Sequence, residues 1–352
     1  MFDDPICGDL SGKKVLLGGE ATEELYDQGS FGRPVEGGLQ LSLVEAAYLL
    51  DRGRIKVSLG GADLDFRSFF EAATAIEAGF EFRYVVYKDL RERGYYVQPG
   101  VTDFRVYPRG GKPGKTAAEF YVQVISERQP VPLNDLVAPM KVAKQMRKRL
   151  MLAVVDEESD ITFYEARERE LKGDTKLEVG GGTATLLEDR VMLWDPESSE
   201  RLHEGGFYGK PGGGRLQLSL VESAYLLEKG ALKIVDRSGM DLNLEEFEKR
   251  ARVVEEDFDM KHRVYRDLRE KDLVVKTGFK FGSHFRVYKR VESSKKVPHS
   301  EYLVHSIPDD HVFHLPVVSR AVRLAHSVRK VMIFAREEEG LVRYLEIGRL
   351  KP

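Results

Sequence analysis

All eight histidines of this chain lie in its second half, between His203 and His326, and residues 1–202 contain none. Imidazole is the only side chain whose unperturbed pKa lies close to neutrality, so it is the usual proton donor and acceptor at physiological pH. We therefore expect acid–base chemistry of this kind from the second half of the chain alone.

The two halves are copies of one another. The segment LQLSLVEAAYLL at 39–50 returns as LQLSLVESAYLL at 216–227, and only one position differs. Shorter matches follow in the same order, among them VYKDLRERG with VYRDLREKD and DFRVY with HFRVY. A period of this length indicates a duplicated domain, not a solenoid repeat.

The copies differ where chemistry is expected. When HSEYLVHSI is aligned with AAEFYVQVI, His299 of the second copy falls on Ala117 of the first. Two further candidate groups fall on identical residues, Tyr288 on Tyr107 and Lys330 on Lys148. The first copy thus lacks the titrating member, which indicates one working site per chain beside a degenerate repeat.

Three motifs of the second copy carry a resemblance: TGFKFGSHFRVY (277–288), HSEYLVH (299–305) and VSRAVRLAHSVRK (318–330). Together they resemble the archaeal tRNA-splicing (tRNA-intron) endonucleases, most closely over about residues 272–335. The tandem layout with a degraded first copy resembles the homodimeric two-repeat class of that family.

The resemblance implies a metal-independent RNA endonuclease without cofactors that excises introns from precursor tRNA at bulge-helix-bulge motifs. Tyr288, His299 and Lys330 occupy the catalytic positions of that family. The implied products are a 2′,3′-cyclic phosphate and a 5′-hydroxyl, and the implied partner is a second copy of the chain. We expect the cytoplasm as its location, because a single cysteine favours a reducing, intracellular setting.

The chemistry of the three side chains suits this reaction, in which the ribose 2′-OH is the nucleophile. Cleavage needs a base, an acid for the leaving 5′-oxygen and a cation for the charged phosphorane. His299 can act as the acid and Lys330 as the fixed cation. A phenol has an unperturbed pKa of about 10, so Tyr288 can act as the base only if positive charge such as that of Lys330 stabilises its phenolate.

RNA binding is expected from the basic segment 318–330, which contains no acidic residue. The resemblance implies two arginines that sandwich a flipped-out bulge base, and arginine suits this role because its planar guanidinium stacks on bases. Arg323 matches the first of them, and Arg349 is our choice for the second, with Arg343 as a rival.

An acidic turn in the first copy is a candidate contact with the partner subunit. Its residues are Asp156, Glu157, Glu158 and Asp160. The resemblance implies that an acidic loop of the degenerate repeat docks into a basic pocket beside the active repeat of the other chain. The alternative is an ordinary solvated hairpin tip.

The elements that must position these residues indicate an α+β fold in each repeat, with a mixed N-terminal subdomain and a C-terminal subdomain whose sheet is flanked by helices. We expect repeats at 1–170 and 180–352, divided near 93 and 271, with a Gly-rich linker at about 170–186. Capping boxes predict helices after Ser42 and Ser219. Further helical stretches are expected at 66–93 and 245–271 and a helix at 317–330, followed by strands at 332–336 and 342–348.

Composition excludes several other classes. The chain has 352 residues, 42% of them hydrophobic and 32% charged, and a net charge of −3, so nucleic-acid binding must come from local patches. No segment has the ~20 apolar residues that a membrane span needs, and the acidic start is unlike a signal peptide. With Cys7 as the one cysteine, an internal disulfide is excluded. The alternatives are a non-catalytic RNA-binding subunit of a splicing complex and a metal-dependent nuclease on a similar fold.

Overall fold

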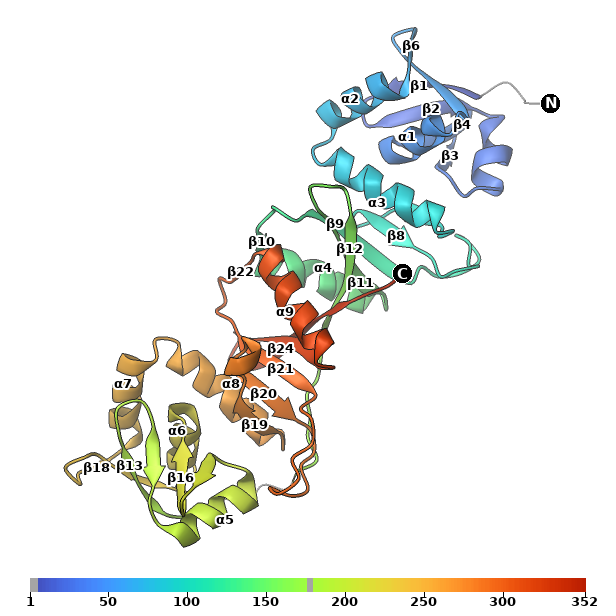
Figure 1. Cartoon of the computed structure of the whole chain (residues 1–352). Helices are drawn as coiled ribbons and strands as arrows, with labels where there is room; N and C mark the ends of the chain where they lie inside the picture. The colour runs from blue at the N-terminus through green and yellow to red at the C-terminus, as the bar shows by residue number, and fades with distance from the viewer. Residues whose placement is uncertain (1–5, 176–179) are drawn as a thin grey trace. The chain divides into compact units, whose positions relative to one another are not determined.

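The computed structural model describes residues 6–175 and 180–352, and the chain divides into two compact units (Figure 1). The first unit contains the described residues up to Ala166 together with His314–Pro316 and Arg349–Pro352. The second contains the described residues of Arg167–Phe313 and Val317–Gly348. Each unit has a six-stranded sheet and a further set of five paired strands, with helices in the same order, which confirms the α+β tandem duplication.

Each unit begins with a six-stranded sheet in which one strand pair is parallel and the other pairs are antiparallel. In the first unit the order is β3-β4-β2-β1-β5-β6, built from β1 (Ile6–Ser11), β2 (Lys14–Gly18), β3 (Arg33–Val35), β4 (Gly38–Ser42), β5 (Ile55–Leu59) and β6 (Ala62–Leu64). In the second unit the order is β15-β16-β14-β13-β17-β18, built from β13 (Thr183–Leu186), β14 (Val191–Leu193), β15 (Lys210–Gly212), β16 (Arg215–Leu218), β17 (Lys233–Val235) and β18 (Asp241–Leu242).

Matching helices accompany the two small sheets. They are the π-helical η1 (Thr22–Asp27), α1 (Leu43–Asp51), α2 (Phe66–Ile76) and α3 (Phe80–Glu92) in the first unit, and α5 (Pro196–Gly206), α6 (Leu220–Glu228), α7 (Leu244–Val254) and α8 (Phe258–Glu270) in the second. Both predicted capping boxes are present, at α1 and at α6. Glu45 and Glu222 also accept a bond from a distant backbone N–H, of Gly32 (2.8 Å) and Gly209 (3.0 Å) respectively. The same carboxylate thus holds a helix start and a loop in each unit, which accounts for the Ser and Glu that the two copies share here.

Each helical stretch expected at 66–93 and 245–271 is in fact two helices. Gly79, with a φ of 70°, adopts the left-handed conformation between α2 and α3, and residues 255–257 separate α7 from α8. α8 packs against α6 on one side and against β19 and β21 of the next sheet on the other. One hydrophobic core therefore runs through both sets of strands of the unit, and the first unit has its own core of the same kind.

The further set of five strands in each unit contains one parallel pair of strands joined by a helix. The first unit contributes β7 (Val97–Pro99), β8 (Phe104–Val106), β9 (Phe120–Ser126), β11 (Arg149–Val155) and β12 (Ile161–Glu168), with α4 (Leu133–Gln145) between the parallel strands β9 and β11. The second contributes β19 (Val274–Thr277), β20 (Phe285–Tyr288), β21 (Tyr302–Ser306), β23 (Val331–Glu338) and β24 (Leu341–Arg349), with α9 (Leu315–Ser327) between the parallel strands β21 and β23. Two short strands, β10 (Val131–Pro132) and β22 (Val312–Phe313), precede these helices, and a single 3-10 turn, η2 (Phe279–Phe281), precedes β20.

Several boundaries differ from the sequence prediction, and the helix expected at 317–330 begins at Leu315. The helix expected at 317–330 ends at Ser327, because Arg329 adopts a positive φ of 55° and the Lys330 N–H closes the helix end on Ala325 O at 2.8 Å. The expected linker at 170–186 is also partly wrong, since residues 183–186 form β13 and Leu171 is buried in the core of the second unit. Residues 176–179 of that linker lie outside the described residues.

The helices of this protein are short. Within residues 6–175 and 180–352, no helix is both long enough and apolar enough to cross a membrane.

Candidate active site

The register of β20, β21 and β23 brings the three motifs of the second repeat to the same end of these neighbouring strands. Val287 pairs with Tyr302, and Tyr302 pairs with Val331. The next row beyond them is Tyr288, Glu301 and Lys330, because the Glu301 N–H donates to Val287 O (3.1 Å) and the Val331 N–H donates to Glu301 O (2.9 Å). Tyr288 and Lys330 thus lie two strand spacings apart, about 10 Å between backbones.

Tyr288, the last residue of β20, is 4% exposed and packs with Phe207, Val274 and Val291. Burial raises the pKa of its hydroxyl, the charge of Glu301 raises that pKa further, and Arg286 opposes the rise. The cation that acts on Tyr288 is therefore Arg286, whereas the sequence had suggested Lys330.

His299 lies in the loop between β20 and β21, and its side chain is exposed. No hydrogen bond or ion pair of its imidazole is found in the part of the chain that the structure describes. Its neighbour Ser300 is buried, and the carbonyl oxygen of Ser300 accepts a hydrogen bond from Lys330 Nζ at 2.8 Å. The Lys330 ammonium is thus bound to the backbone next to His299. The imidazole of His299 itself is exposed and can be reached by a substrate.

Lys330 stands between α9 and β23. The left-handed residue Arg329 turns the chain so that Lys330 leads into the strand, and Arg147 (φ 55°) does the same before Lys148 in the first unit. Burial lowers the pKa of the Lys330 ammonium, Glu301 opposes this, and Arg286 and Lys280 lower it further. The two local structures match, so retention of lysine in the first repeat needs no catalytic explanation.

Sequence comparison missed Arg286 and Glu301. Arg286 lies two residues before Tyr288 on the same face of β20, with its guanidinium carbon 6.0 Å from the centre of the Tyr288 ring. Glu301 occupies the middle of the row and accepts a hydrogen bond from the Lys289 N–H at 3.0 Å. Their matches in the first repeat are Arg105 and Glu119, so comparing the repeats gave no signal at either position.

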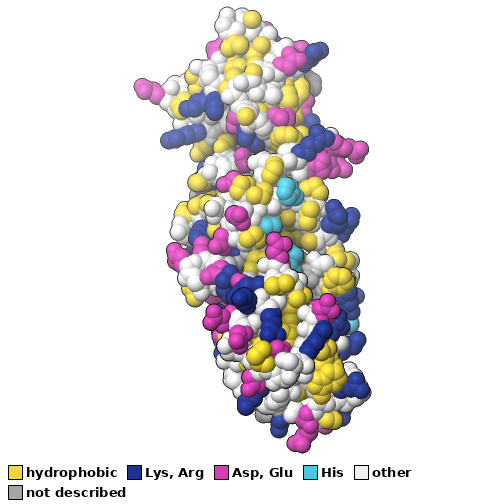
Figure 2. Space-filling model, turned by 90° about the vertical axis from the view of Figure 1, so that its left-hand side faces the viewer, with side chains coloured by type: hydrophobic (Ala, Val, Ile, Leu, Met, Phe, Trp, Pro, Cys, Tyr) yellow, Lys and Arg dark blue, Asp and Glu magenta, His cyan; other side chains and the backbone are white. Residues whose placement is uncertain are grey.

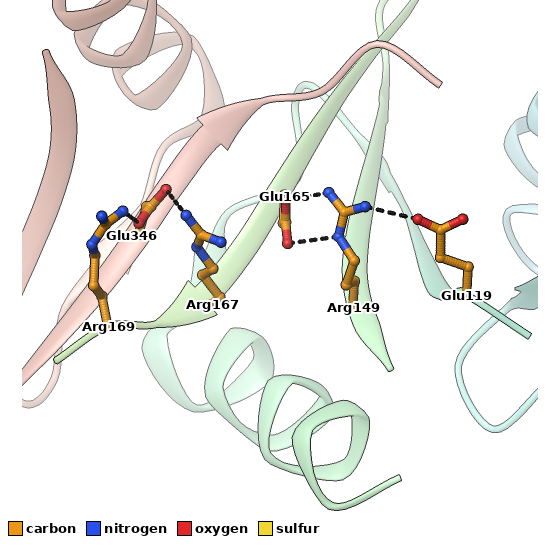
Figure 3. A network of polar contacts seen from close by, with 6 residues as sticks. All are labelled: Glu119, Arg149, Glu165, Arg167, Arg169 and Glu346. Atoms are coloured by element: carbon orange, nitrogen blue, oxygen red, sulfur yellow. Dashed lines mark hydrogen bonds and ion pairs between the residues drawn. The ribbon is translucent and has the colours of Figure 1, made fainter. Parts of the chain in front are cut away.

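The first repeat uses the matching groups differently. There the Tyr107 hydroxyl donates to Gln98 Oε1 at 2.9 Å, and Glu119 pairs with Arg149 at 2.8 Å. Figure 3 shows that Arg149 also forms two hydrogen bonds with Glu165 of β12, at 2.7 and 2.9 Å. Polar groups that line the candidate site in the second repeat are therefore occupied by internal partners in the first.

In the second unit, the buried carboxylate of Glu346 on β24 forms ion pairs with two arginines. Figure 3 shows Glu346 accepting from Arg167, at 2.8 Å, and from Arg169. The Arg169 N–H also donates to Tyr344 O at 2.9 Å. These contacts hold β24, which pairs with β23 and so supports the strand that follows Lys330.

Two models of known protein domains each match this chain twice. A model of the tRNA intron endonuclease catalytic C-terminal domain matches residues 80–163 and 258–344, and a model of the N-terminal domain of that family matches residues 6–70 and 182–248. The chain belongs to the tRNA intron endonuclease family. It is an enzyme that excises introns from precursor tRNA, as the sequence indicated.

Its relatives are similar over nearly their whole length. A tRNA-splicing endonuclease of Methanococcoides burtonii is 55% identical over 342 residues, which cover 96% of this chain and 97% of the relative. One of Methanosarcina acetivorans is 55% identical over 346 residues, 97% and 99% of the two chains. One of Halobacterium salinarum is 41% identical over 365 residues, 98% and 99% of the two chains.

The candidate RNA-binding arginines occupy exposed positions. Arg323 lies on α9, and Arg320 and Arg329 are exposed on the same segment. Arg349 ends β24 with an exposed side chain, whereas Arg343 lies 3.6 Å from Glu338 and 3.9 Å from Glu168. Basic and acidic side chains are interspersed over the face drawn in Figure 2. On this face, RNA binding would therefore depend on small local groups of basic residues and not on one large positive surface.

The acidic turn of the first repeat joins β11 to β12 and is built partly by its own acids. The Asp156 Oδ1 atom accepts from the N–H groups of Glu158 (3.0 Å) and Asp160 (2.9 Å), and Glu157 pairs with Arg128. The carboxylates of Glu158 and Asp160 are exposed. Glu158 and Asp160 are therefore the two acidic residues of the turn whose carboxylates can contact another molecule.

Two other histidines form a stacked pair away from the row. His284 and His305 have ring centres 4.0 Å apart, and His284 Nδ1 accepts from the Ser306 N–H at 3.1 Å. Burial lowers the pKa of His284 to about 3 and lowers that of His305. Within the described residues, no group of three or more His, Cys, Asp or Glu side chains could hold a metal ion.

Proposed function

We propose that Tyr288, His299 and Lys330 form the one catalytic centre of each chain and that the first repeat is not catalytic. The observation that carries the proposal is the shared edge of β20, β21 and β23, where Lys330 Nζ binds the carbonyl next to His299. The absence of a matching histidine at Ala117 supports the division between the repeats.

The reaction that fits this centre is attack of a ribose 2′-OH on the adjacent phosphate. His299, exposed and without an internal partner among the described residues, would give its proton to the leaving 5′-oxygen. The Lys330 ammonium would stabilise the charged phosphorane. Tyr288 would receive the 2′-OH proton, and Arg286 beside its ring favours the phenolate that this step requires.

This chemistry needs no metal ion, and its products are a 2′,3′-cyclic phosphate and a 5′-hydroxyl. We propose that the substrate is recognised as a bulge-helix-bulge, since splayed bulge bases can be reached by side chains and A-form duplex bases cannot. Arg323 and Arg349 would stack on one such base. Arg349 is preferred to Arg343 because the latter lies near two carboxylates.

A homodimer would supply two such centres for the two splice sites of one intron. We propose that the acidic turn, chiefly Glu158 and Asp160, meets the basic segment around Arg320 and Arg329 of the partner chain. Such complementarity fixes register more than it adds affinity. The proposed location of the enzyme is the cytoplasm, where precursor tRNA is its substrate.

The experiment that tests the proposal uses a precursor tRNA with a bulge-helix-bulge and a matched RNA in which both bulges are paired. The pure protein is incubated with each in excess EDTA, and the product ends are identified. We expect the intron to leave the bulged RNA alone, with cyclic phosphate and 5′-hydroxyl ends. Cleavage abolished by EDTA, or equal cleavage of the paired RNA, would contradict the proposal.

A further inference from the structure

The connection between β19 and β20 is longer in the second repeat than its counterpart in the first. It spans residues 278–284, whereas the connection between β7 and β8 spans residues 100–103. The flanking strands pair in the same register in both units. The additional residues form η2 and contain Phe279, Lys280 and Phe281. Duplicated domains diverge where only one copy retains a task, and this insertion stands in the copy with His299.

The turn is held in one conformation by its own backbone. The Phe281 N–H donates to Gly278 O at 2.8 Å, and the Gly282 N–H donates to Phe279 O at 2.9 Å. A Cβ at Gly278 would come within 2.8 Å of the Phe285 backbone, so only glycine fits there. Gly282, with a φ of 64°, ends the turn in the left-handed region. A rigid turn loses little conformational entropy when a ligand binds to it.

Phe279 projects from this turn with 88% of its surface exposed. A single exposed apolar residue is common on protein surfaces, so its neighbourhood decides its meaning. The ammonium groups of Lys280 and Lys330 lie 5.0 and 5.6 Å from the centre of the adjacent Phe281 ring. Lys280 is also among the charges that lower the pKa of Lys330. Two cations held this close to one ring are suited to an anion between them.

We propose that the η2 turn is a base-stacking platform for the RNA, with Phe279 under an unpaired base next to the scissile phosphate and Lys280 on an adjoining phosphate. This inference rests on the proposed function, because Lys330 fixes the position of the platform relative to the cleaved bond. An aromatic ring accepts any base, because every base has a π-face. The ligand is therefore an unpaired nucleotide of any sequence, and a paired nucleotide is not accepted because its faces are covered.

The test measures stacking and cleavage separately. Bulge-helix-bulge RNAs carry 2-aminopurine at each unpaired position in turn and a 2′-deoxyribose at the cleavage sites, so that they bind without reacting. Quenching of 2-aminopurine fluorescence reports a stacked base. The proteins are the full chain, Phe279→Ala, Phe279→Trp, Lys280→Ala and the matched control Val101→Ala, whose side chain is 76% exposed in the corresponding loop of the first repeat.

We expect the unmodified protein to quench 2-aminopurine fluorescence at one or more unpaired positions. Phe279→Ala should lose that quenching and reduce kcat/KM on the cleavable RNA by roughly tenfold to a hundredfold, the usual range for one lost base stack. Phe279→Trp should restore both signals, and Val101→Ala should behave as the full chain. Lys280→Ala should weaken binding and reduce its salt dependence while the quenching at saturation remains.

Two results would overturn the inference. One is unchanged quenching and cleavage in Phe279→Ala. The other is a changed oligomeric state of Phe279→Ala by light scattering with its quenching retained, which would make Phe279 a protein–protein contact. Failure of the full chain to cleave the ribose form would instead contradict the proposed function, and the quenching on the deoxy RNA would still decide whether Phe279 stacks on a base.

Discussion

Burial disfavours the charged forms of both Tyr288 and Lys330. It raises the pKa of the Tyr288 hydroxyl and lowers that of the Lys330 ammonium. Tyr288 must therefore lose its own proton to solvent before it can accept the 2′-OH proton, and the charge of Arg286 lowers the cost of that ionisation.

Replacing His299 by alanine should lower the cleavage rate by about 10²–10⁴, the usual contribution of a general acid. RNA affinity should change little, because the loop backbone is held by Lys330. Single-turnover cleavage and a binding assay on the same bulged RNA check this, with His326→Ala on α9 as the control for an exposed histidine. Undiminished cleavage by His299→Ala would remove this residue from the centre.

The alkaline limb of the pH–rate profile should belong to Lys330. Its lowered pKa means that the ammonium loses its proton at a lower pH than a free lysine, so the rate should fall as pH rises through that value. Lys330→Arg should move the fall to higher pH, because a guanidinium stays charged. The profile of kcat for Lys330→Arg and for the control Lys148→Arg measures this. An alkaline limb at the same pH in both variants would assign it to another group.

His284 should make stability depend on pH. Its pKa is lowered from 6.5 to about 3, so the unfolded chain binds more protons between these values and stability falls as pH falls through this window. For one group the loss is about 1.4 kcal/mol per pH unit, or roughly 3 kcal/mol by pH 4. Denaturant unfolding at pH 7 and pH 4 should show a smaller difference in His284→Asn, which can still accept from the Ser306 N–H. An equal difference would mean that His284 is not the group responsible.

At the scale of elements, capping boxes and periodicity predicted the helices after Ser42 and Ser219, the helix before Lys330 and the two closing strands. They could not predict the row formed by Tyr288, Glu301 and Lys330, because register depends on pairing between strands that are distant in sequence. Glu301 and Arg286 escaped notice for a related reason: both repeats contain the same residue types there, so comparison gave no contrast. The helix end at Ser327 was misplaced because a left-handed arginine gives no signal of the kind that glycine gives.

The internal contacts of the acidic turn decide which of its residues can be used to test dimer assembly. Asp156 holds the turn, so a charge reversal there would test folding and not assembly. Reversal of Glu158 and Asp160 to lysine should weaken dimerisation and lower cleavage in proportion, with each repeat still folded. Sedimentation and cleavage assays check this, with Glu339→Lys in the hairpin turn of the second repeat as the control. A normal dimer with normal cleavage would make the turn a solvated hairpin tip.

At the scale of the whole molecule, the two repeats differ in how their matching polar groups are paired. The first repeat retains the fold but occupies its polar groups internally, through Tyr107 with Gln98 and Glu119 with Arg149. The second repeat leaves His299 exposed and adds the η2 turn. Under the proposed function, one chain would offer one centre and a homodimer would offer two, one for each end of an intron.

The central claim is that the RNA supplies its own nucleophile to this centre. The most direct measurement is cleavage of a bulge-helix-bulge RNA with a single 2′-deoxyribose at one of its two splice sites. We predict that the full chain cuts only the unmodified site, at the rate seen with all-ribose RNA, and leaves a 2′,3′-cyclic phosphate there. Cleavage at the 2′-deoxy site would contradict the account, because water would then be the nucleophile.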